Sequence, residues 1–200
     1  MTTTERLFYL CELMSIRRLS LALYLGVAAL LAATTPARAA EEKIWHVKAI
    51  HPEGRLLDVK AIDKQGKIHP VKAIQTEGNL HLLDIKALVD DKRLPVKVLV
   101  SNDKYAPVKA IGEDGTIFDI KAIMPDGTKL DVKGVSRSGS IIHIKAIGPQ
   151  GTFYGVKAIS PEGRVYDIKG IKMSSDRVET KVHGVEVAAH IKALPQAPEQ

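Results

Sequence analysis

The chain has 200 residues, of which 45% are hydrophobic, 26% are charged and only 4% are aromatic. With 15 glycines and ample aliphatic content, this composition excludes collagen and simple disorder and is typical of one globular domain or two small ones. The net charge of +6 is well short of a nucleic-acid-binding arm, and the lone Cys11 excludes an internal disulfide framework.

Residues 1–39 have the features of a secretory signal peptide. Arg17 and Arg18 are followed by an apolar run over residues 19–31 and by a small-residue cleavage site at residues 37–39. The apolar run is shorter than the roughly 20 residues that a membrane-spanning helix needs. We therefore expect an exported protein, periplasmic or secreted. The residues around the arginine pair lack the usual twin-arginine spacing, which favours the general secretory route.

The leader is complete from Met14 onward, so we interpret residues 1–13 as an extension upstream of the true start. Cleavage after Ala39 removes Cys11 and leaves 25 basic and 21 acidic side chains, a net charge of +4. We expect residues 40–200 to form a single domain, in which the absence of cysteine excludes thiol chemistry.

A short motif of the type VKAI, IKAI or IKGI recurs along the rest of the chain, mostly at steps of twelve residues. Such a fixed period indicates an array of units that bury their apolar faces against one another. The central lysines of the motif are Lys48, Lys60, Lys72, Lys86, Lys97, Lys109, Lys121, Lys133, Lys145, Lys157, Lys169 and Lys192.

Turn signals separate the motifs. Proline followed two residues later by glycine occurs at residues 52–54, 125–127, 149–151 and 161–163, and proline and glycine in this order favour a three-residue hairpin loop with a bulge. The segments between turns alternate and are rich in Val and Ile, which predicts one strand per repeat. Counting outward from the loops predicts four cross-strand pairs: Lys48 with Asp58, Lys121 with Asp131, Asp119 with Lys133, and Lys157 with Asp167.

The parity of this register gives the sheet two unlike faces. One face carries Val or Ile, flanked by Ala or Gly opposite a larger side chain, and is the expected core. The other face carries lysine and aspartate, bordered by aliphatic residues. These borders predict more exposed apolar surface than a monomer usually has, and therefore self-association or a protein partner: Ile50, Ile62, Ile74, Ile111, Ile123, Ile147, Ile159 and Ile171.

The repeat is irregular in two places. In residues 67–107 the lysine spacing changes, and Pro70, Pro95 and Pro107 take the strand position that elsewhere holds Asp. Proline prefers strand edges and bulges, so we interpret this stretch as a seam of the sheet. Residues 172–180 interrupt the pattern again, before a final segment that we expect to close the structure.

These features predict an all-β fold, an antiparallel meander of about twelve short strands. A round barrel of twelve strands would be roughly 25 Å across, which Val, Ala and Leu do not fill, whereas packed sheets lie about 10 Å apart. We therefore expect a flattened barrel or sandwich. A small propeller, a β-prism and an open single-layer meander are the alternatives.

The lysine row is the main candidate for binding. We interpret it first as a structural ladder with aspartate, and second as a polyanion-binding face for nucleic acid, lipopolysaccharide or an acidic glycan. Excess positive charge is expected around Lys109, Lys145 and Lys157, which are the candidate anion-binding residues. The histidines lack metal-ligand spacing and are expected in solvent or in turns, so no metal or cofactor is predicted.

No catalytic motif appears: there is no nucleophile elbow, phosphate loop or dinucleotide fingerprint. We therefore expect no enzyme, but a structural or binding module of the bacterial envelope. The alternative outside this class is a hydrolase whose site lies in the irregular middle segment, which would require a cleft near residues 79–107 with a buried carboxylate pair.

The tandem VKAI and IKGI blocks with Pro-acidic-Gly turns resemble uncharacterised secreted bacterial repeat proteins, a domain of unknown function. The resemblance implies no activity, ligand or functional residue.

Overall fold

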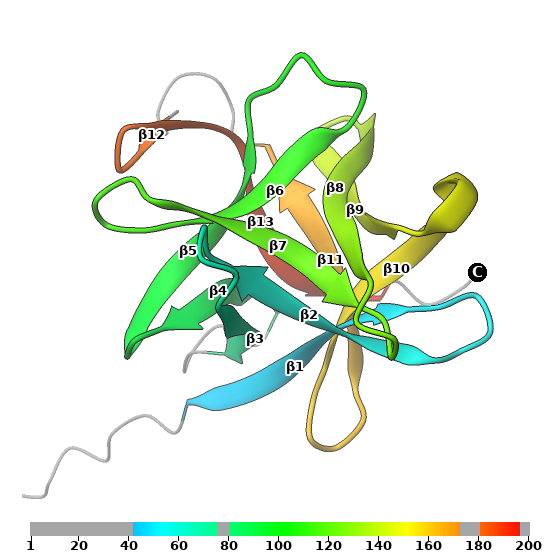
Figure 1. Ribbon diagram of the computed structural model, residues 1–200. Coiled ribbons are helices and arrows are strands. Elements are labelled where there is room, and N and C mark those ends of the chain that lie inside the picture. The colour runs from blue at the N-terminus through cyan, green and yellow to red at the C-terminus, as the bar shows by residue number, and fades with distance from the viewer. Residues whose placement is uncertain (1–41, 76–80, 173–180, 197–200) are drawn as a thin grey trace, which may run out of the picture. The chain divides into compact units, whose positions relative to one another are not determined.

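The computed structural model describes residues 42–75, 81–172 and 181–196 (Figure 1). The expected leader and the irregular segment 173–180 lie outside these residues. The described part contains thirteen strands, one 3₁₀ turn and no α-helix. The elements are β1 (Lys43–Ile50), β2 (Leu56–Ile62), β3 (Ile68–Gln75), β4 (Leu83–Val89), β5 (Lys92–Leu99), β6 (Ala106–Ile111), β7 (Ile117–Ile123), β8 (Lys129–Ser138), β9 (Ile141–Ile147), η1 (Pro149–Gly151), β10 (Phe153–Ile159), β11 (Val165–Ile171), β12 (Lys181–Val182) and β13 (Val185–Pro195).

The strands form an antiparallel meander that closes into a barrel, which confirms the expected fold class. Strand β1 pairs with β10 as well as with its neighbours β2 and β3, so the sheet is closed and the open single-layer alternative is wrong. The final long strand β13 takes part in closure by pairing with β11, β4 and β5. The two-residue strand β12 is an appendage that pairs with β13.

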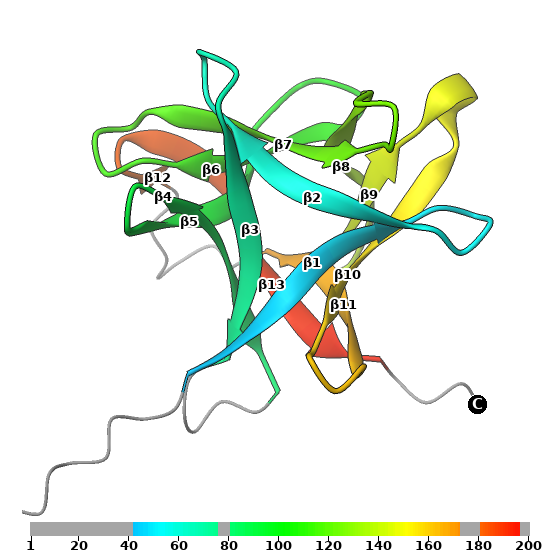
Figure 2. The same cartoon turned by 60° about the horizontal axis from the view of Figure 1, so that its bottom comes forward.

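Partner switching halfway along each strand organises the sheet. Along one edge, each strand of the barrel is hydrogen-bonded to a single partner strand. Along its other edge, the strand pairs with one partner over its first half and with a second partner over the rest. The result is four groups of three mutually paired strands: β1–β2–β3, β4–β5–β13, β6–β7–β8 and β9–β10–β11. Figure 2 shows β1, β2 and β3 crossing at steep angles to outline one such triangle.

Six further ladders join the four groups. They are β1–β10, β2–β7, β3–β4, β5–β6, β8–β9 and β11–β13, so every group is linked once to each of the other three. The pairing network therefore has the connectivity of a tetrahedron whose corners are strand triangles.

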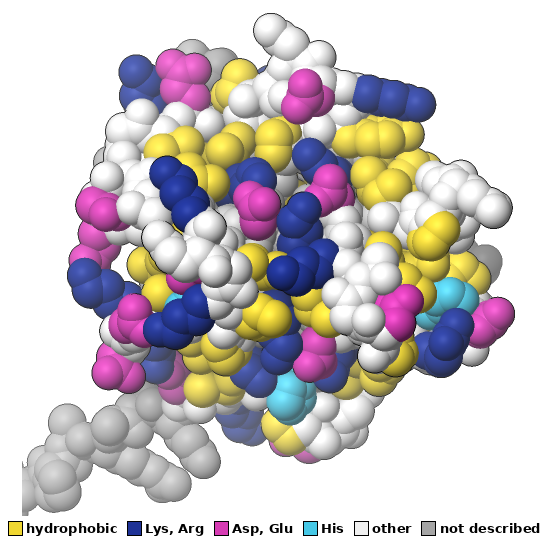
Figure 3. All heavy atoms as spheres, viewed as in Figure 1, with side chains coloured by type: hydrophobic (Ala, Val, Ile, Leu, Met, Phe, Trp, Pro, Cys, Tyr) yellow, Lys and Arg dark blue, Asp and Glu magenta, His cyan; other side chains and the backbone are white. Residues whose placement is uncertain are grey.

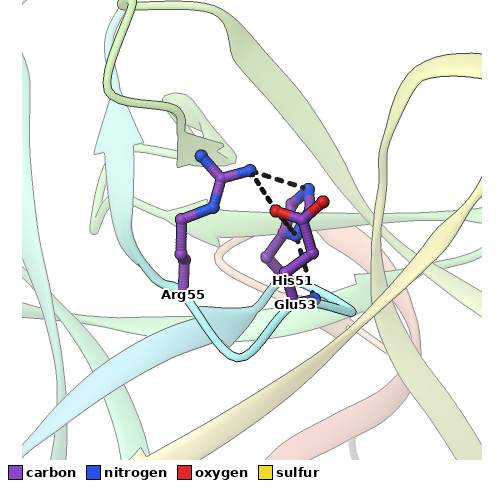
Figure 4. Close-up of polar contacts among 3 residues, drawn as sticks. All are labelled: His51, Glu53 and Arg55. Atoms are coloured by element: carbon purple, nitrogen blue, oxygen red, sulfur yellow. Dashed lines mark hydrogen bonds and ion pairs between the residues drawn. The ribbon is translucent and has the colours of Figure 1, made fainter.

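The predicted hairpin loops are confirmed at the turns with proline and glycine. In the β10–β11 hairpin the Ser160 amide donates to the Arg164 carbonyl at 2.9 Å, and Gly163 adopts a φ of 85°, which favours glycine. In the β1–β2 turn, Figure 4 shows an added side-chain clasp. The Glu53 amide donates to His51 Nδ1 at 3.2 Å, and the Arg55 guanidinium donates to the Glu53 carboxylate at 2.9 Å.

Three of the four predicted cross-strand pairs are confirmed: Lys48 with Asp58, Lys121 with Asp131, and Lys157 with Asp167. The fourth, Asp119 with Lys133, is wrong. The β7–β8 hairpin is paired over only three positions, after which β8 leaves β7 for β6. Lys133 therefore faces Pro107, and Asp119 faces Lys109 on β6.

The irregular stretch 67–107 contains β3, β4, β5 and the first two residues of β6, and these strands pair consecutively within the closed sheet. Its spacing changes lie in the connections. One of them is the tight β4–β5 turn, in which Asp90 and Asp91 both adopt positive φ.

The core is formed by one Val or Ile from each strand centre. Twelve such side chains surround a central cavity of about 10 Å³: Val47, Val59, Val71, Ile85, Val96, Val108, Ile120, Val132, Ile144, Val156, Ile168 and Ile191. This volume is at the lower limit for a single water, and the lining is entirely aliphatic, so we expect the cavity to be dry. Steep strand crossing explains why small side chains fill this twelve-strand barrel, whereas they would leave a round barrel of twelve strands hollow.

Large and small side chains face each other around this centre. Ala158 faces Tyr166 and Ala73 faces the fully buried Trp45. On β5 the position that holds Ala in most other strands is Val98, and here the facing residue on β13 is the smaller Ala189. This complementarity keeps the interior at uniform density.

The aliphatic borders of the lysine face are more covered than expected. Ile62, Ile74 and Ile111 are buried, and the other five are half-buried. Self-association through these borders stays a prediction.

Candidate anion-binding site

The twelve strand-centre lysines all lie on the outer face, one residue after the central Val or Ile. In each strand triangle three of them surround the middle of the triangle, and we call each such set a lysine triad. The triads are Lys48/Lys60/Lys72 (β1–β3), Lys86/Lys97/Lys192 (β4, β5 and β13), Lys109/Lys121/Lys133 (β6–β8) and Lys145/Lys157/Lys169 (β9–β11). Figure 3 shows basic and acidic side chains interspersed with hydrophobic ones on one face.

Five aspartates neutralise only part of this charge. Asp58 contacts Lys48 and, at 3.2 Å, Lys60. The other ion pairs join Asp84 to Lys192, Asp119 to Lys109 and Lys121, Asp131 to Lys121, and Asp167 to Lys157 and Lys169. Three triads therefore hold three lysines against one aspartate, and the β6–β8 triad holds three against two.

Five lysines have no carboxylate within ion-pair distance among the described residues. Lys72 contacts His46 and Lys97 contacts His190. The other three lie opposite residues that offer no side-chain acceptor: Lys86 opposite Pro95, Lys133 opposite Pro107, and Lys145 opposite Gly155. Positive charge is thus concentrated where proline or glycine replaces aspartate.

The pKa values of these lysines reflect burial first and crowding by other lysines second. Burial lowers the pKa of Lys97 to about 8, aided by the neighbouring charges of Lys86 and Lys192. Burial also lowers the pKa of Lys72 and of Lys145, and in each case the two other lysines of the triad add to the effect. The triads therefore hold positive charge at an energetic cost, which an incoming anion would relieve.

The pKa values of the aspartates are also lowered, which for a carboxyl group favours the charged form. A hydrogen bond from Lys48 is the main cause that lowers the pKa of Asp58. For Asp84, Asp131 and Asp167, burial is the largest single cause and would raise the pKa, but hydrogen bonds from lysine and the charges of neighbouring lysines together outweigh it, and the net shift is downward. These carboxylates remain ionised and are unsuited to act as general acids.

Three histidines take the aspartate position beside lysines, as the sequence predicts. The Lys72 charge lowers the pKa of His46, and burial followed by the Lys169 charge lowers that of His143. The prediction of solvent or turn positions is wrong for His69, which is 4% exposed. His69 occupies an inward position, where its ring stands edge-on to Phe118 at 5.8 Å.

The three predicted anion-binding residues fall into two triads. Lys145 and Lys157 lie together in the β9–β11 triad, whereas Lys109 lies in the β6–β8 triad, where Asp119 holds it. Sequence reasoning missed Lys86 and Lys133. The prolines at the aspartate position were the available signal, but which lysine each proline faces depends on how the triangles close.

A separate hollow of about 550 Å³ lies between the β4–β5 and β6–β7 turns, bordering the region considered for a hydrolase. Its carboxylates are Asp90, Glu113 and Asp114, all exposed. Hydrogen bonds, from Lys67, Lys92 and Thr116 respectively, lower their pKa values. The hollow therefore lacks the buried carboxylate pair that acid catalysis would require.

The described residues contain no group of three or more His, Cys, Asp or Glu arranged to hold a metal ion. In the same part of the chain, no helix has the length and apolarity to span a membrane.

Residues 41–194 match the family of unknown function DUF7486. The chain belongs to this family. Among curated proteins and among solved structures, none matches it.

Proposed function

We propose that the DUF7486 domain of this protein is an exported, non-enzymatic binding module of the bacterial envelope that binds polyanions through its lysine triads. The observation that carries the proposal is the excess of lysine over aspartate in each triad. Lys86, Lys133 and Lys145, which face proline or glycine, have no carboxylate within ion-pair distance among the described residues. Lysine clusters of this kind attract phosphate, sulfate and carboxylate groups.

Lysine desolvation also favours anion binding over a purely structural role. An exposed lysine–aspartate ladder would contribute only about 0.2–1 kcal/mol per pair to stability. A ladder built for stability would place an aspartate opposite each lysine, whereas five of the twelve lack one. Burial and the neighbouring charges of Lys86 and Lys192 both disfavour the charged form of Lys97.

Salt-dependent retention on heparin tests the binding proposal. We expect the purified protein to bind immobilised heparin at low salt and to elute as salt rises, because counter-ions compete with lysine contacts. For comparison, a variant in which Lys72, Lys86, Lys133 and Lys145 are replaced by Gln lacks four of the lysines that have no carboxylate partner. Passage of the unsubstituted protein through the column at low salt would contradict the proposal.

The proposed export depends on the signal peptide expected at residues 1–39, and a separate experiment tests it. Protein expressed with residues 1–39 should appear outside the cytoplasm with a new N-terminus at Ala40. A variant with Leu25→Arg in the apolar run should remain uncleaved. Recovery of the unsubstituted protein in the cytoplasm with its leader intact would contradict export.

A further inference from the structure

The six ladders that join the strand triangles place lysines opposite each other in pairs. These pairs are Lys48/Lys157, Lys60/Lys121, Lys72/Lys86, Lys97/Lys109, Lys133/Lys145 and Lys169/Lys192. In five of them at least one lysine contacts an aspartate or a histidine. Lys133 and Lys145 form the pair in which neither lysine has such a contact among the described residues.

The residues that flank this pair leave room for a ligand. Lys133 faces Pro107 and Lys145 faces Gly155. A Cβ atom at Gly155 would lie 4.0 Å from Lys145 Nζ and 3.7 Å from Lys157 Cε, so the absent side chain leaves space bordered by two lysines. Asp131, on the same strand as Lys133, is already held by Lys121.

Two outward aromatic residues flank the pair: Phe153 begins β10, and Tyr105 directly precedes β6. Tyr105 precedes Pro107 by two residues, and Phe153 precedes Gly155 by two residues. Their rings stand edge-on with centroids 5.8 Å apart, and Phe153 is 44% exposed. The amine of Lys104 lies 5.1 Å from the centre of the Tyr105 ring and adds a further cation.

This placement of aromatic residues is specific to the Lys133/Lys145 region. The equivalent position lies four residues before each central lysine, within the strand or, for Leu82 and Tyr105, directly before it. At the other ten lysines this position holds an aliphatic or basic residue. The two aromatic side chains at this position both flank the one lysine pair that lacks an acceptor. Paired ammonium groups recognise an anionic substituent, and an exposed aromatic ring offers an apolar surface to the face of a sugar ring.

We infer that Lys133 and Lys145, with Tyr105 and Phe153, form the main binding site for an acidic glycan, a chain of pyranose rings bearing sulfate, phosphate or carboxylate. This inference rests on the proposed polyanion-binding function and assigns its ligand class and primary site. The lysines hold the anionic group between β8 and β9, and the aromatic rings contact the sugar to which that group is attached.

Isothermal titration with two polyanions tests this site: a heparin oligosaccharide, which has sugar rings, and inorganic polyphosphate, which has none. The double variant Lys133→Gln/Lys145→Gln should lose about tenfold or more in affinity for heparin, since each lost charge-assisted contact contributes measurably. The matched control Lys60→Gln/Lys121→Gln removes the same charge from a facing pair that already contacts aspartate, and should lose less than about threefold.

The variant Phe153→Ser separates a glycan site from a general anion site. It should weaken heparin binding several-fold and leave polyphosphate binding unchanged, because polyphosphate has no ring to pack. Circular dichroism and thermal unfolding verify that each variant is folded.

The outcomes distinguish the two proposals. Equal losses in both lysine double variants, or equal effects of Phe153→Ser on both ligands, would overturn the glycan site while leaving polyanion binding in place. Failure of the unsubstituted protein to bind either ligand would overturn both.

Discussion

On the inner face of the sheet each strand centre carries valine or isoleucine, and on the outer face the next residue is lysine. The inner side chains are buried, tightly complementary and uncharged, whereas the outer ones are half-buried and incompletely neutralised. Burial of aliphatic side chains stabilises a fold by several kcal/mol per residue, whereas an exposed ion pair contributes a fraction of one. The stability of the fold therefore comes from the inner face, and the outer face is available for another role.

A buried strand-centre residue should give the largest effect on stability. Ile168→Ala removes a side chain that lines the central cavity and should lower the free energy of unfolding by about 2–5 kcal/mol. Urea denaturation measures the loss. The matched control is Ile141→Ala, because Ile141 is 40% exposed and its truncation should have little effect. Equal losses in both variants would break the distinction between the faces.

The same substitution at two glycines gives a second, smaller contrast. At Gly134, on the inner face, a new Cβ atom would lie 2.7 Å from Ile142 Cγ2, so Gly134→Ala should destabilise by about 1–3 kcal/mol. At Gly155, on the outer face, the nearest atom would be 3.7 Å away, and Gly155→Ala should be nearly neutral.

A double-mutant cycle sharpens this result. If the Gly134→Ala penalty comes from contact with Ile142, combination with Ile142→Ala should be less destabilising than the sum of the two single variants. Strict additivity would assign the penalty to another cause.

The crowded lysines predict an unusual pH dependence. The pKa of Lys97 is about 8 in the folded chain, against an ordinary value of 10.5, so the unfolded chain binds more protons between these values. Stability should therefore rise as pH increases from about 8 toward 9.5, and the lowered pKa values of Lys72 and Lys145 act in the same direction.

Urea midpoints measured between pH 7 and pH 9.5 verify this expectation. Lys97→Gln should be more stable than the unsubstituted protein at pH 7 and should show a weaker rise. A decrease in stability over this range would show that the lowered lysine pKa values do not govern the pH dependence of stability.

The smallest effect is expected for a lysine that has its carboxylate partners. Lys121→Gln removes the contacts with Asp119 and Asp131 on a face where these groups remain partly solvated. The free energy of unfolding should fall by less than about 1 kcal/mol, and added salt should shrink the difference further. A loss as large as that of Ile168→Ala would show that the outer ladder is a main source of stability.

Local features of the chain were predictable. Proline and glycine at the turns set the loop length, and loop length sets the register of each hairpin, so Lys157 opposite Asp167 follows from counting. Parity then assigns Ile168 to the inside and Lys169 to the outside. The candidate site was only partly predictable, because Lys145 and Lys157 stood out as excess charge, whereas Lys133 did not.

By itself, the sequence determined the strands, the turns, the hairpin pairs and the face on which each side chain lies, because these depend on contacts within about twelve residues. Only the tertiary structure decided where each strand changes partner. The pairing of Lys133 with Pro107 and the contact between Tyr105 and Phe153 follow from that change. The reason is geometric: the β7–β8 hairpin aligns its two strands over only three positions near the loop, and beyond them the steep crossing that fills the interior brings β8 to β6.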